Sequence, residues 1–145
     1  MDYIAGIFER TRTEINIAAI CSAASAGISF LVGGVDAPIQ ALLVLIVADY
    51  ATGMIAGWKT GMLSSDRGFR GVTKKVAIVA AVALANVVDV ALGTHAIRAA
   101  VIGGYAGMES LSLIENVDRM GYGEYIPPFL RTKLEQLRVE KGVKL

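Results

Sequence analysis

Apolar residues along this chain come in long blocks separated by short polar stretches, instead of alternating or recurring at every third or fourth position. Four blocks stand out, at residues 15–31, 38–58, 76–92 and 97–114. An α-helix needs about 20 apolar residues to cross the hydrocarbon core of a bilayer, and each block is close to that length. The pattern therefore predicts an all-α integral membrane protein with four transmembrane helices.

The polar stretches between the blocks set the boundaries of a single membrane domain at residues 1–145. We expect transmembrane helices at residues 15–33, 38–58, 76–92 and 97–115. A short amphipathic arm at residues 1–14 either lies in the membrane interface or extends the first helix. A basic loop covers residues 59–75, and a basic amphipathic tail with a short helix from Pro127 covers residues 116–145. The fourth block is diluted by serines and Glu109, so it could also lie flat or stop short of a full crossing.

Positive charges alternate between the two sides that these helices would define. The amino-terminal arm has two lysine or arginine residues, the turn near Asp36 has none, the basic loop has five and the tail has six. Lysine and arginine are enriched in cytoplasmic loops, so this pattern predicts both termini in the cytoplasm after four crossings and argues against three. The basic residues expected at the membrane surface are Arg67, Arg70, Lys74 and Lys75.

The composition leaves little room for a soluble catalytic domain, because 54% of the residues are hydrophobic and only 19% are charged. The basic residues flank the apolar blocks and form no single patch, so we expect no nucleic-acid binding. A lone Cys21 in the first block and a lone His95 in a turn give no metal-ligand spacing. No glycine-rich phosphate motif and no nucleophile–base arrangement is visible. The sequence predicts a protein that is not an enzyme and that uses neither cofactor nor metal.

The candidate chemistry lies in three acids inside the apolar blocks, Asp49, Asp89 and Glu109. Ionised and facing lipid, three such groups would cost on the order of 8–10 kcal/mol on insertion. Segments built largely of alanine, glycine and serine cannot offset that cost. The acids should therefore form hydrogen bonds between helices, face water inside an oligomer, or relay protons. The first two can alternate between a closed and an open state.

Two further sets of residues follow from helical spacing. Each acid shares a helix face with a polar neighbour three residues away, which predicts a polar lining made of Asp49, Thr52, Asn86, Asp89, Glu109 and Ser112. Small residues at four-residue steps let helix backbones approach closely in lipid. Two such series predict helix-packing faces, at Gly53, Gly57 and Gly61 and at Ala99, Gly103 and Gly107.

Several motifs occur in a fixed order between Leu42 and Leu137. They are Asp49-Tyr50-Ala51-Thr52-Gly53, Ser64-Ser65, Gly71-Val72-Thr73-Lys74-Lys75, Asp89, the stretch from Glu109 to Asn116, Gly121 and Ile126-Pro127. In this combination the chain resembles the toxin-secretion/phage-lysis holin family, which includes holins of Gram-positive phages and clostridial toxin-export holins. The first apolar block carries no motif of that family.

The resemblance implies a phage- or prophage-encoded protein that oligomerises in the bacterial cytoplasmic membrane and opens lesions through which an endolysin leaves the cell. Its partners would be other copies of itself and membrane lipids, with the endolysin or a toxin depending on it without stable binding. Two alternatives stay open: a non-lytic toxin-export holin, and a small ion or proton channel or transporter accessory subunit.

Overall fold

The computed structural model describes residues 2–130, 132–133 and 136, with residues 2–11 described by their backbone alone. This part of the chain contains four long helices and no strand: α1 (Asp2–Leu31), α2 (Ala37–Lys59), α3 (Ser65–Leu92) and α4 (Ala96–Val117). A π-helical turn (Asp118–Tyr122) and a 3₁₀ turn (Gly123–Tyr125) follow. The all-α prediction is confirmed. The predicted helix from Pro127 lies largely outside the described residues.

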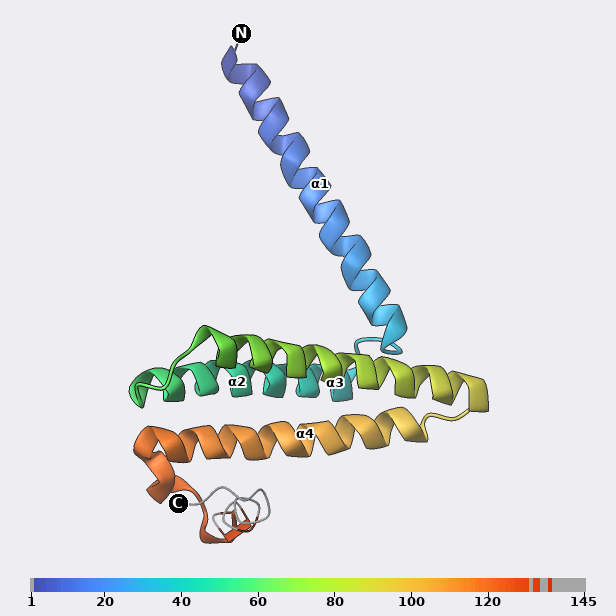
Figure 1. Cartoon of the computed structure of the whole chain (residues 1–145). Coiled ribbons are helices and arrows are strands. Elements are labelled where there is room, and N and C mark those ends of the chain that lie inside the picture. Colours follow the sequence, from blue (N-terminus) through green and yellow to red (C-terminus); the bar gives the residue numbers. More distant parts are fainter. Residues whose placement is uncertain (1, 131, 134–135, 137–145) are drawn as a thin grey trace.

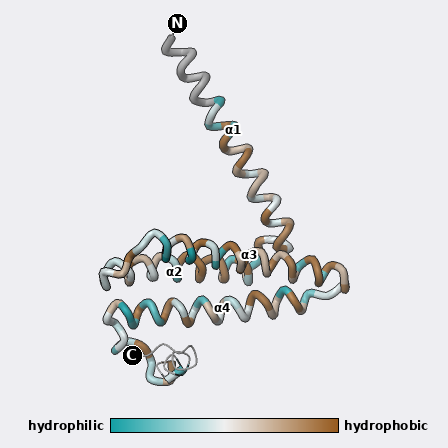
Figure 2. Tube along the Cα trace, viewed as in Figure 1, coloured by the Kyte–Doolittle hydropathy of each residue, from teal (hydrophilic) through white to brown (hydrophobic). Residues whose placement is uncertain are grey.

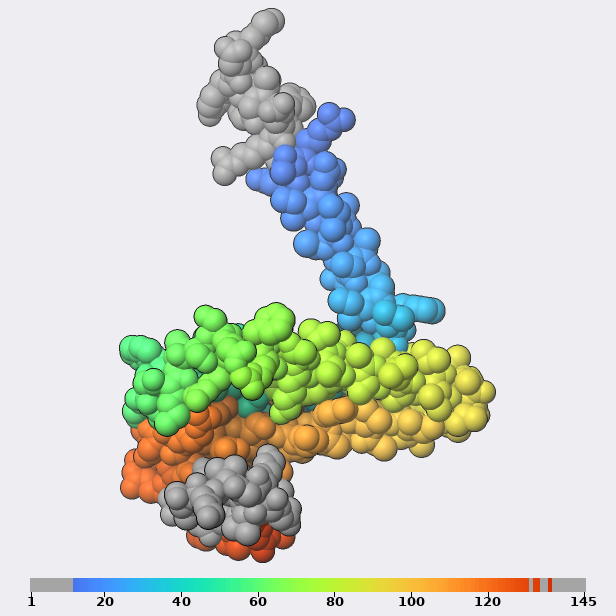
Figure 3. All heavy atoms as spheres, viewed as in Figure 1, coloured from blue at the N-terminus to red at the C-terminus, as the bar shows by residue number. Residues whose placement is uncertain are grey.

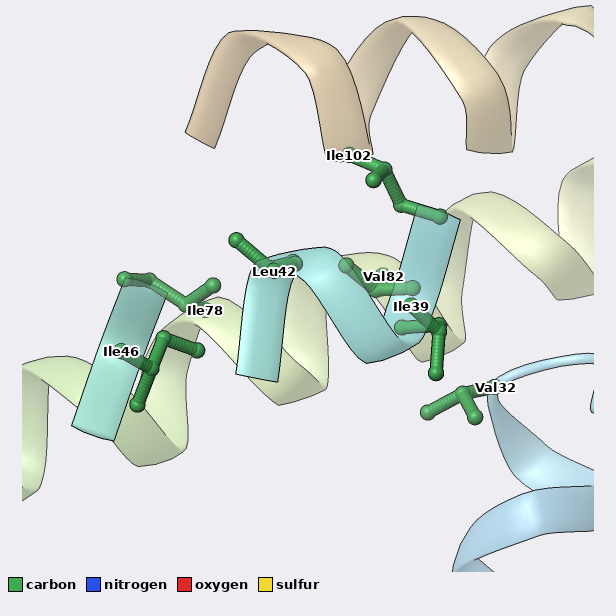
Figure 4. Close-up of a cluster of buried hydrophobic side chains, with 7 residues drawn as sticks. All are labelled: Val32, Ile39, Leu42, Ile46, Ile78, Val82 and Ile102. Carbon is green, nitrogen blue, oxygen red and sulfur yellow. The ribbon is translucent and has the colours of Figure 1, made fainter. Parts of the chain in front are cut away.

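Helices α2, α3 and α4 lie side by side as an antiparallel bundle, while α1 leaves one end of that bundle obliquely (Figure 1). The hydrophobic core lies between the three bundle helices and is built from branched aliphatic side chains. Val32 closes it at the end where α1 enters (Figure 4). The other members are Ile39, Leu42, Ile46, Ile78, Val82 and Ile102.

Local sequence signals explain where the bundle helices begin and turn. Asp36 accepts the backbone N–H of Ile39 at 3.3 Å, and Pro38 occupies the first turn of α2, where no backbone donor is needed. Ser64 caps α3 in the same way, accepting the N–H of Arg67 at 3.3 Å. Gly93 ends α3 with φ of 64°, a left-handed conformation that glycine adopts without a Cβ clash.

Within the described residues, three helices, and not the predicted four, are long and apolar enough to cross a membrane: residues 12–31 of α1, all of α2, and α3. Figure 2 shows long hydrophobic stretches along these three helices and a mixture of hydrophobic and hydrophilic residues along α4. The polar residues that weaken the fourth block, such as Glu109, lower its hydropathy. Helix α4 is therefore held by packing against α2 and α3, and the four-crossing prediction is corrected to three candidate spans.

The helices also shift two segment boundaries relative to the sequence-based prediction. The basic stretch at residues 59–75 is mostly helical, because α3 begins at Ser65 and leaves only a short turn after Lys59. The amino-terminal arm is continuous with the first apolar block in α1, so the alternative in which the arm extends the first helix applies.

Candidate functional site: a charge network inside the bundle

The centre of the site is a lysine that bridges two of the predicted acids. Lys75 of α3 donates to Asp49 Oδ2 of α2 at 2.5 Å and also to Glu109 Oε2 of α4. The side chain of Glu109 is fully buried, and those of Asp49 and Lys75 are only 12% and 11% exposed. One ammonium group therefore ties together three helices from inside the bundle.

Asn116 of α4 extends the network toward α2. Its Nδ2 donates to Asp49 Oδ1 at 3.0 Å, to the Asp49 backbone oxygen at 3.1 Å and to Thr52 Oγ1 at 3.2 Å. Thr52 in turn donates to the Ala48 carbonyl at 2.8 Å, so its oxygen remains free to accept. A Cβ at Gly53 would lie 3.4 Å from Asn116 Nδ2, so Asn116 packs directly over the backbone of α2 at this glycine.

The network contains two carboxylates, Asp49 and Glu109, but only one enclosed ammonium group, that of Lys75. Lys74 Nζ lies 3.5 Å from Glu109 Oε1, but its side chain is 47% exposed. Glu109 Oε1 has no hydrogen-bond donor among the described residues. Removing one partner of such a buried ion pair costs about 3–5 kcal/mol, because the remaining charge is left without compensation. Lys75 is thus the group on which the burial of both carboxylates depends.

Helical periodicity brings these side chains to the bundle interior. On α3, Lys75 lies on the same stripe as the buried residues Ile78, Val82, Ala85 and Asp89. On α4, Glu109 and Asn116 are seven residues apart, which is two helical turns, and both are buried. Spacing could have signalled Lys75 as an interior residue, although the sequence analysis placed it in a surface loop. That assignment is corrected.

The other two predicted polar residues, Asn86 and Asp89, lie at the opposite end of the bundle, at the α3–α4 turn. Asp89 accepts the backbone N–H groups of Ile97 at 3.2 Å and Arg98 at 2.8 Å, together with the Thr94 hydroxyl. The residue before α4, His95, makes no side-chain capping bond. Asp89 therefore caps α4 from the neighbouring helix.

A clamp formed by Asn86 and Arg98 holds the corner between α1 and α2. Asn86 Nδ2 donates to the Leu31 carbonyl at 3.1 Å, and Arg98 donates to the carbonyls of Val32 at 2.5 Å and Gly34 at 3.1 Å. Arg98 also pairs with Asp36 at 2.7 Å, and this hydrogen-bonded pair holds the pKa of the Asp36 carboxyl below its ordinary value. The sequence analysis did not assign Arg98 a role.

The remaining predicted residues are dispersed. Ser112 is half-buried on α4, and it is not among the residues of the charge network. Gly57 is buried against Leu63, whereas Gly61 closes the turn after α2 with φ of 67°. The small residues of α4 at the predicted packing face, Ala99, Gly103 and Gly107, are exposed. Their role in packing stays a prediction.

The basic residues before Lys75 lie at the start of α3. Arg67 donates to the Met62 carbonyl at 2.8 Å, and Arg70 pairs with the exposed Asp66 one turn before it. Lys59, at the end of α2, donates to the Met120 carbonyl at 2.5 Å and lies 4.5 Å from the ring centre of Tyr122. The basic turn and the end of α4 are therefore at the same end of the bundle.

Among the described residues, no group of three His, Cys, Asp or Glu side chains is placed to hold a metal ion.

These features define a helical, membrane-embedded protein whose interior holds charged groups. A model of the bacteriophage holin family matches residues 26–139, which is most of the chain. The chain belongs to the bacteriophage holin family, and the prediction made from its motifs is confirmed.

Several relatives are similar over most of the same region. An uncharacterised protein of Listeria monocytogenes is 46% identical over 93 residues, which cover 63% of this chain and 66% of that protein, just under two thirds of its length. An uncharacterised protein of Clostridium perfringens is 37% identical over 118 residues, or 80% of this chain and 86% of that protein. An uncharacterised protein of Bacillus subtilis is 34% identical over 113 residues, which cover 77% of this chain and 79% of that protein. No solved structure matches the chain.

Proposed function

We propose that this protein is a holin that oligomerises in the bacterial cytoplasmic membrane and opens lesions through which an endolysin reaches the cell wall. The observation that carries the proposal is the buried Asp49–Lys75–Glu109 network in a chain with three candidate membrane spans. Charged groups inside a membrane bundle are costly to keep, and they generally serve an aqueous path or a switch. Membership in the holin family supports the same reading and a non-enzymatic role.

In the closed state the two carboxylates are neutralised by Lys75 between the three helices. Separation of α4 from α2 and α3 would break the Lys75–Glu109 pair and the bonds from Asn116, and it would expose Asp49, Thr52 and Glu109. Their charges would then favour water over lipid and would line the lesion. Because this separation gives up buried ion pairs and hydrogen bonds, opening would need the compensating contacts of an oligomer.

The matching experiment is inducible expression in bacteria with and without a co-expressed endolysin, followed by a membrane-potential dye and culture density. A holin gives a delay, then an abrupt collapse of potential, and lysis that requires the endolysin. Steady growth with a graded ion leak would instead favour the channel or transporter subunit. Loss of potential without release of the endolysin, but with export of a neighbouring toxin, would favour the non-lytic alternative.

A further inference from the structure

A pocket lies at the basic end of the bundle, between the second half of α2, the start of α3 and the end of α4. Its volume is about 190 Å³, roughly ten times the space that one buried water molecule needs. Figure 3 shows the turn after α2 (green) directly against the end of α4 (orange), and the bond from Lys59 to the Met120 carbonyl joins these two segments. The pocket is therefore built where three helices meet.

Two arginines from different segments line this pocket, Arg67 in the first turn of α3 and Arg119 just after α4. The described lining residues include no Asp or Glu. Neither arginine is in a salt bridge within the described part of the chain. Arg67 donates one N–H to the Met62 carbonyl at 2.8 Å, which is a neutral acceptor. Two positive charges thus line one space that holds no counter-charge.

Hydroxyl groups add hydrogen-bond donors to the same lining. Ser64 accepts the backbone N–H of Arg67, which leaves its own O–H to donate. Tyr50 lies across α3, since a Cβ at Gly71 would be 3.3 Å from its ring and a Cβ at Gly68 would be 3.8 Å from its hydroxyl. The start of α3 also carries the positive end of the helix dipole. Every one of these features favours an anion.

The same end of the bundle has the character of a membrane interface. Trp58 and Tyr125 are both 76% exposed, and tryptophan and tyrosine are enriched at the level of the lipid headgroups. Tyr50 precedes Trp58 by eight residues of α2, so the pocket extends roughly 12 Å from that level into the bundle. Met54 and Leu63 give it apolar walls. A matching ligand has a charged group at the interface and an apolar remainder.

We infer that this pocket binds the phosphate group of an anionic phospholipid. Guanidinium groups hold phosphate oxygens through paired hydrogen bonds, and basic pockets between membrane helices bind anionic headgroups. A zwitterionic headgroup also carries an ammonium group, for which the lining offers no carboxylate. Free phosphate would leave Met54 and Leu63 without an apolar partner. Phosphatidylglycerol, which has a phosphodiester and an uncharged glycerol, meets both conditions.

The bound phosphate would bridge two segments that are far apart in the sequence. Arg67 and Arg119 come from the start of α3 and the end of α4, so one ligand that accepts from both joins these ends. A ligand that binds only the folded state stabilises it. The inference requires only that the protein is embedded in a membrane, and it does not depend on the formation of lesions.

The test is thermal unfolding of the full chain in an uncharged detergent with increasing phosphatidylglycerol or phosphatidylcholine, followed by circular dichroism. Phosphatidylglycerol should raise the melting temperature to a plateau, and phosphatidylcholine should not. Arg119→Gln should weaken the apparent affinity for phosphatidylglycerol about tenfold, because it removes a charged donor. The matched control is Arg70→Gln, which removes the same charge from α3 but lies outside the pocket and pairs with Asp66. It should keep the affinity of the unmodified protein.

A second variant, Arg67→Gln, should weaken the affinity in the same way and keeps the inference testable if Arg119→Gln does not fold. Melting temperatures without lipid show whether each variant is folded.

Three results would overturn the inference. Equal weakening in Arg119→Gln and Arg70→Gln would assign the binding to the overall positive charge of this end. Equal stabilisation by the two lipids would show an apolar contact without headgroup recognition. Displacement of phosphatidylglycerol by an equal concentration of inorganic phosphate would show a site for a soluble anion.

Discussion

Lys75 is the residue on which the interior of this bundle depends most. Its ammonium group is the donor to both Asp49 and Glu109, and Lys74, the other nearby cation, is half exposed. If the lysine were removed, the two carboxylates would repel each other in a low-dielectric interior, Asp49 would lose its ion pair, and Glu109 would keep only the half-exposed Lys74. The stability of the bundle should therefore be far more sensitive at Lys75 than at the basic residues that precede it.

Lys75→Met should lower the free energy of unfolding by about 3–5 kcal/mol, because it removes the charge while keeping an unbranched side chain one atom shorter. Arg70→Met is the control, since Arg70 and its partner Asp66 have side chains that are 75% and 69% exposed. That exposed pair should contribute less than about 0.5 kcal/mol. Thermal unfolding in detergent, followed by circular dichroism at neutral pH, measures both. Equal melting temperatures for the two variants would contradict the assigned role of Lys75.

Asp49→Asn addresses function instead of stability. The amide keeps the size of the carboxylate and can still accept from Asn116, but it replaces a charged bond to Lys75 by a neutral one, a loss of roughly 1–2 kcal/mol. We expect the onset of lysis to shift while the amount of protein in the membrane fraction stays the same. Asp66→Asn, which removes an exposed acid, should leave the onset unchanged. Unchanged timing in Asp49→Asn would make that carboxylate a packing group only.

The sequence was informative about which residues are polar and which face they share, and less so about what they contact. The structure brings Asp49, Thr52 and Glu109 together, and their place in the lining of a lesion stays a prediction. The run of charges around their partner Lys75 predicts a surface loop, although Lys75 shares a helical stripe with the buried Ile78 and Val82. Asp89, like Asp49, is an acid inside an apolar block with a polar neighbour three residues away. It nevertheless caps a helix and does not pair with a lysine.

Helix α4 depends on its neighbour for its first turn. The backbone N–H groups at the start of a helix lack internal acceptors, and here the carboxylate of Asp89 on α3 accepts two of them. The negative charge also interacts favourably with the positive end of the helix dipole. The short turn at Gly93 brings the two helices close enough for this contact.

Asp89→Ala should cost about 1–2 kcal/mol, the usual range for removing a side-chain cap. The loss should appear first as faster hydrogen exchange at the amides of Ile97 and Arg98, with the middle of α4 less affected. His95→Ala is the control, since His95 makes no side-chain capping bond. Similar exchange rates in the two variants would show that the amides at the start of α4 are protected by something other than Asp89.

The clamp at the α1–α2 corner should make stability depend on acidity. Its Asp36 has a pKa held below the ordinary value of 3.8 by the hydrogen bonds from Arg98. The folded state therefore binds that proton less readily than the unfolded state. The resulting stabilisation is complete above the unfolded pKa and is lost as the pH falls through the lower folded value.

Asp36→Asn should remove this component of the acid sensitivity. We expect the difference in melting temperature between the unmodified protein and the variant to be largest near neutral pH and to shrink as the pH falls below 3.8. Melting in detergent at a series of acidic pH values measures it, with Asp66→Asn as the exposed control. A difference that grows with acidity would contradict the pairing of Asp36 with Arg98.

The whole bundle could be predicted as all-α and membrane-embedded, because long apolar blocks have few other stable forms. The number of candidate spans could not be predicted in the same way. Helix α4 is held in the bundle by contacts with α2 and α3, and its own hydropathy does not reveal these contacts. The basic stretch at residues 59–75 likewise predicts a loop, because its charges mask a helical continuation that begins at Ser65.

The arrangement of the bundle predicts which ends of the helices share a side of the membrane. Lys59 contacts Met120 and Tyr122, so the basic turn after α2 and the end of α4 should both face the cytoplasm, where positive charge is favoured. In a Cys21→Ala background, Thr60→Cys and Glu124→Cys should be protected in intact spheroplasts from a membrane-impermeant maleimide, and Val35→Cys, at the opposite end, should be labelled. Labelling of Glu124→Cys together with Val35→Cys would mean that the end of α4 does not return alongside the basic turn, and would contradict the antiparallel bundle itself.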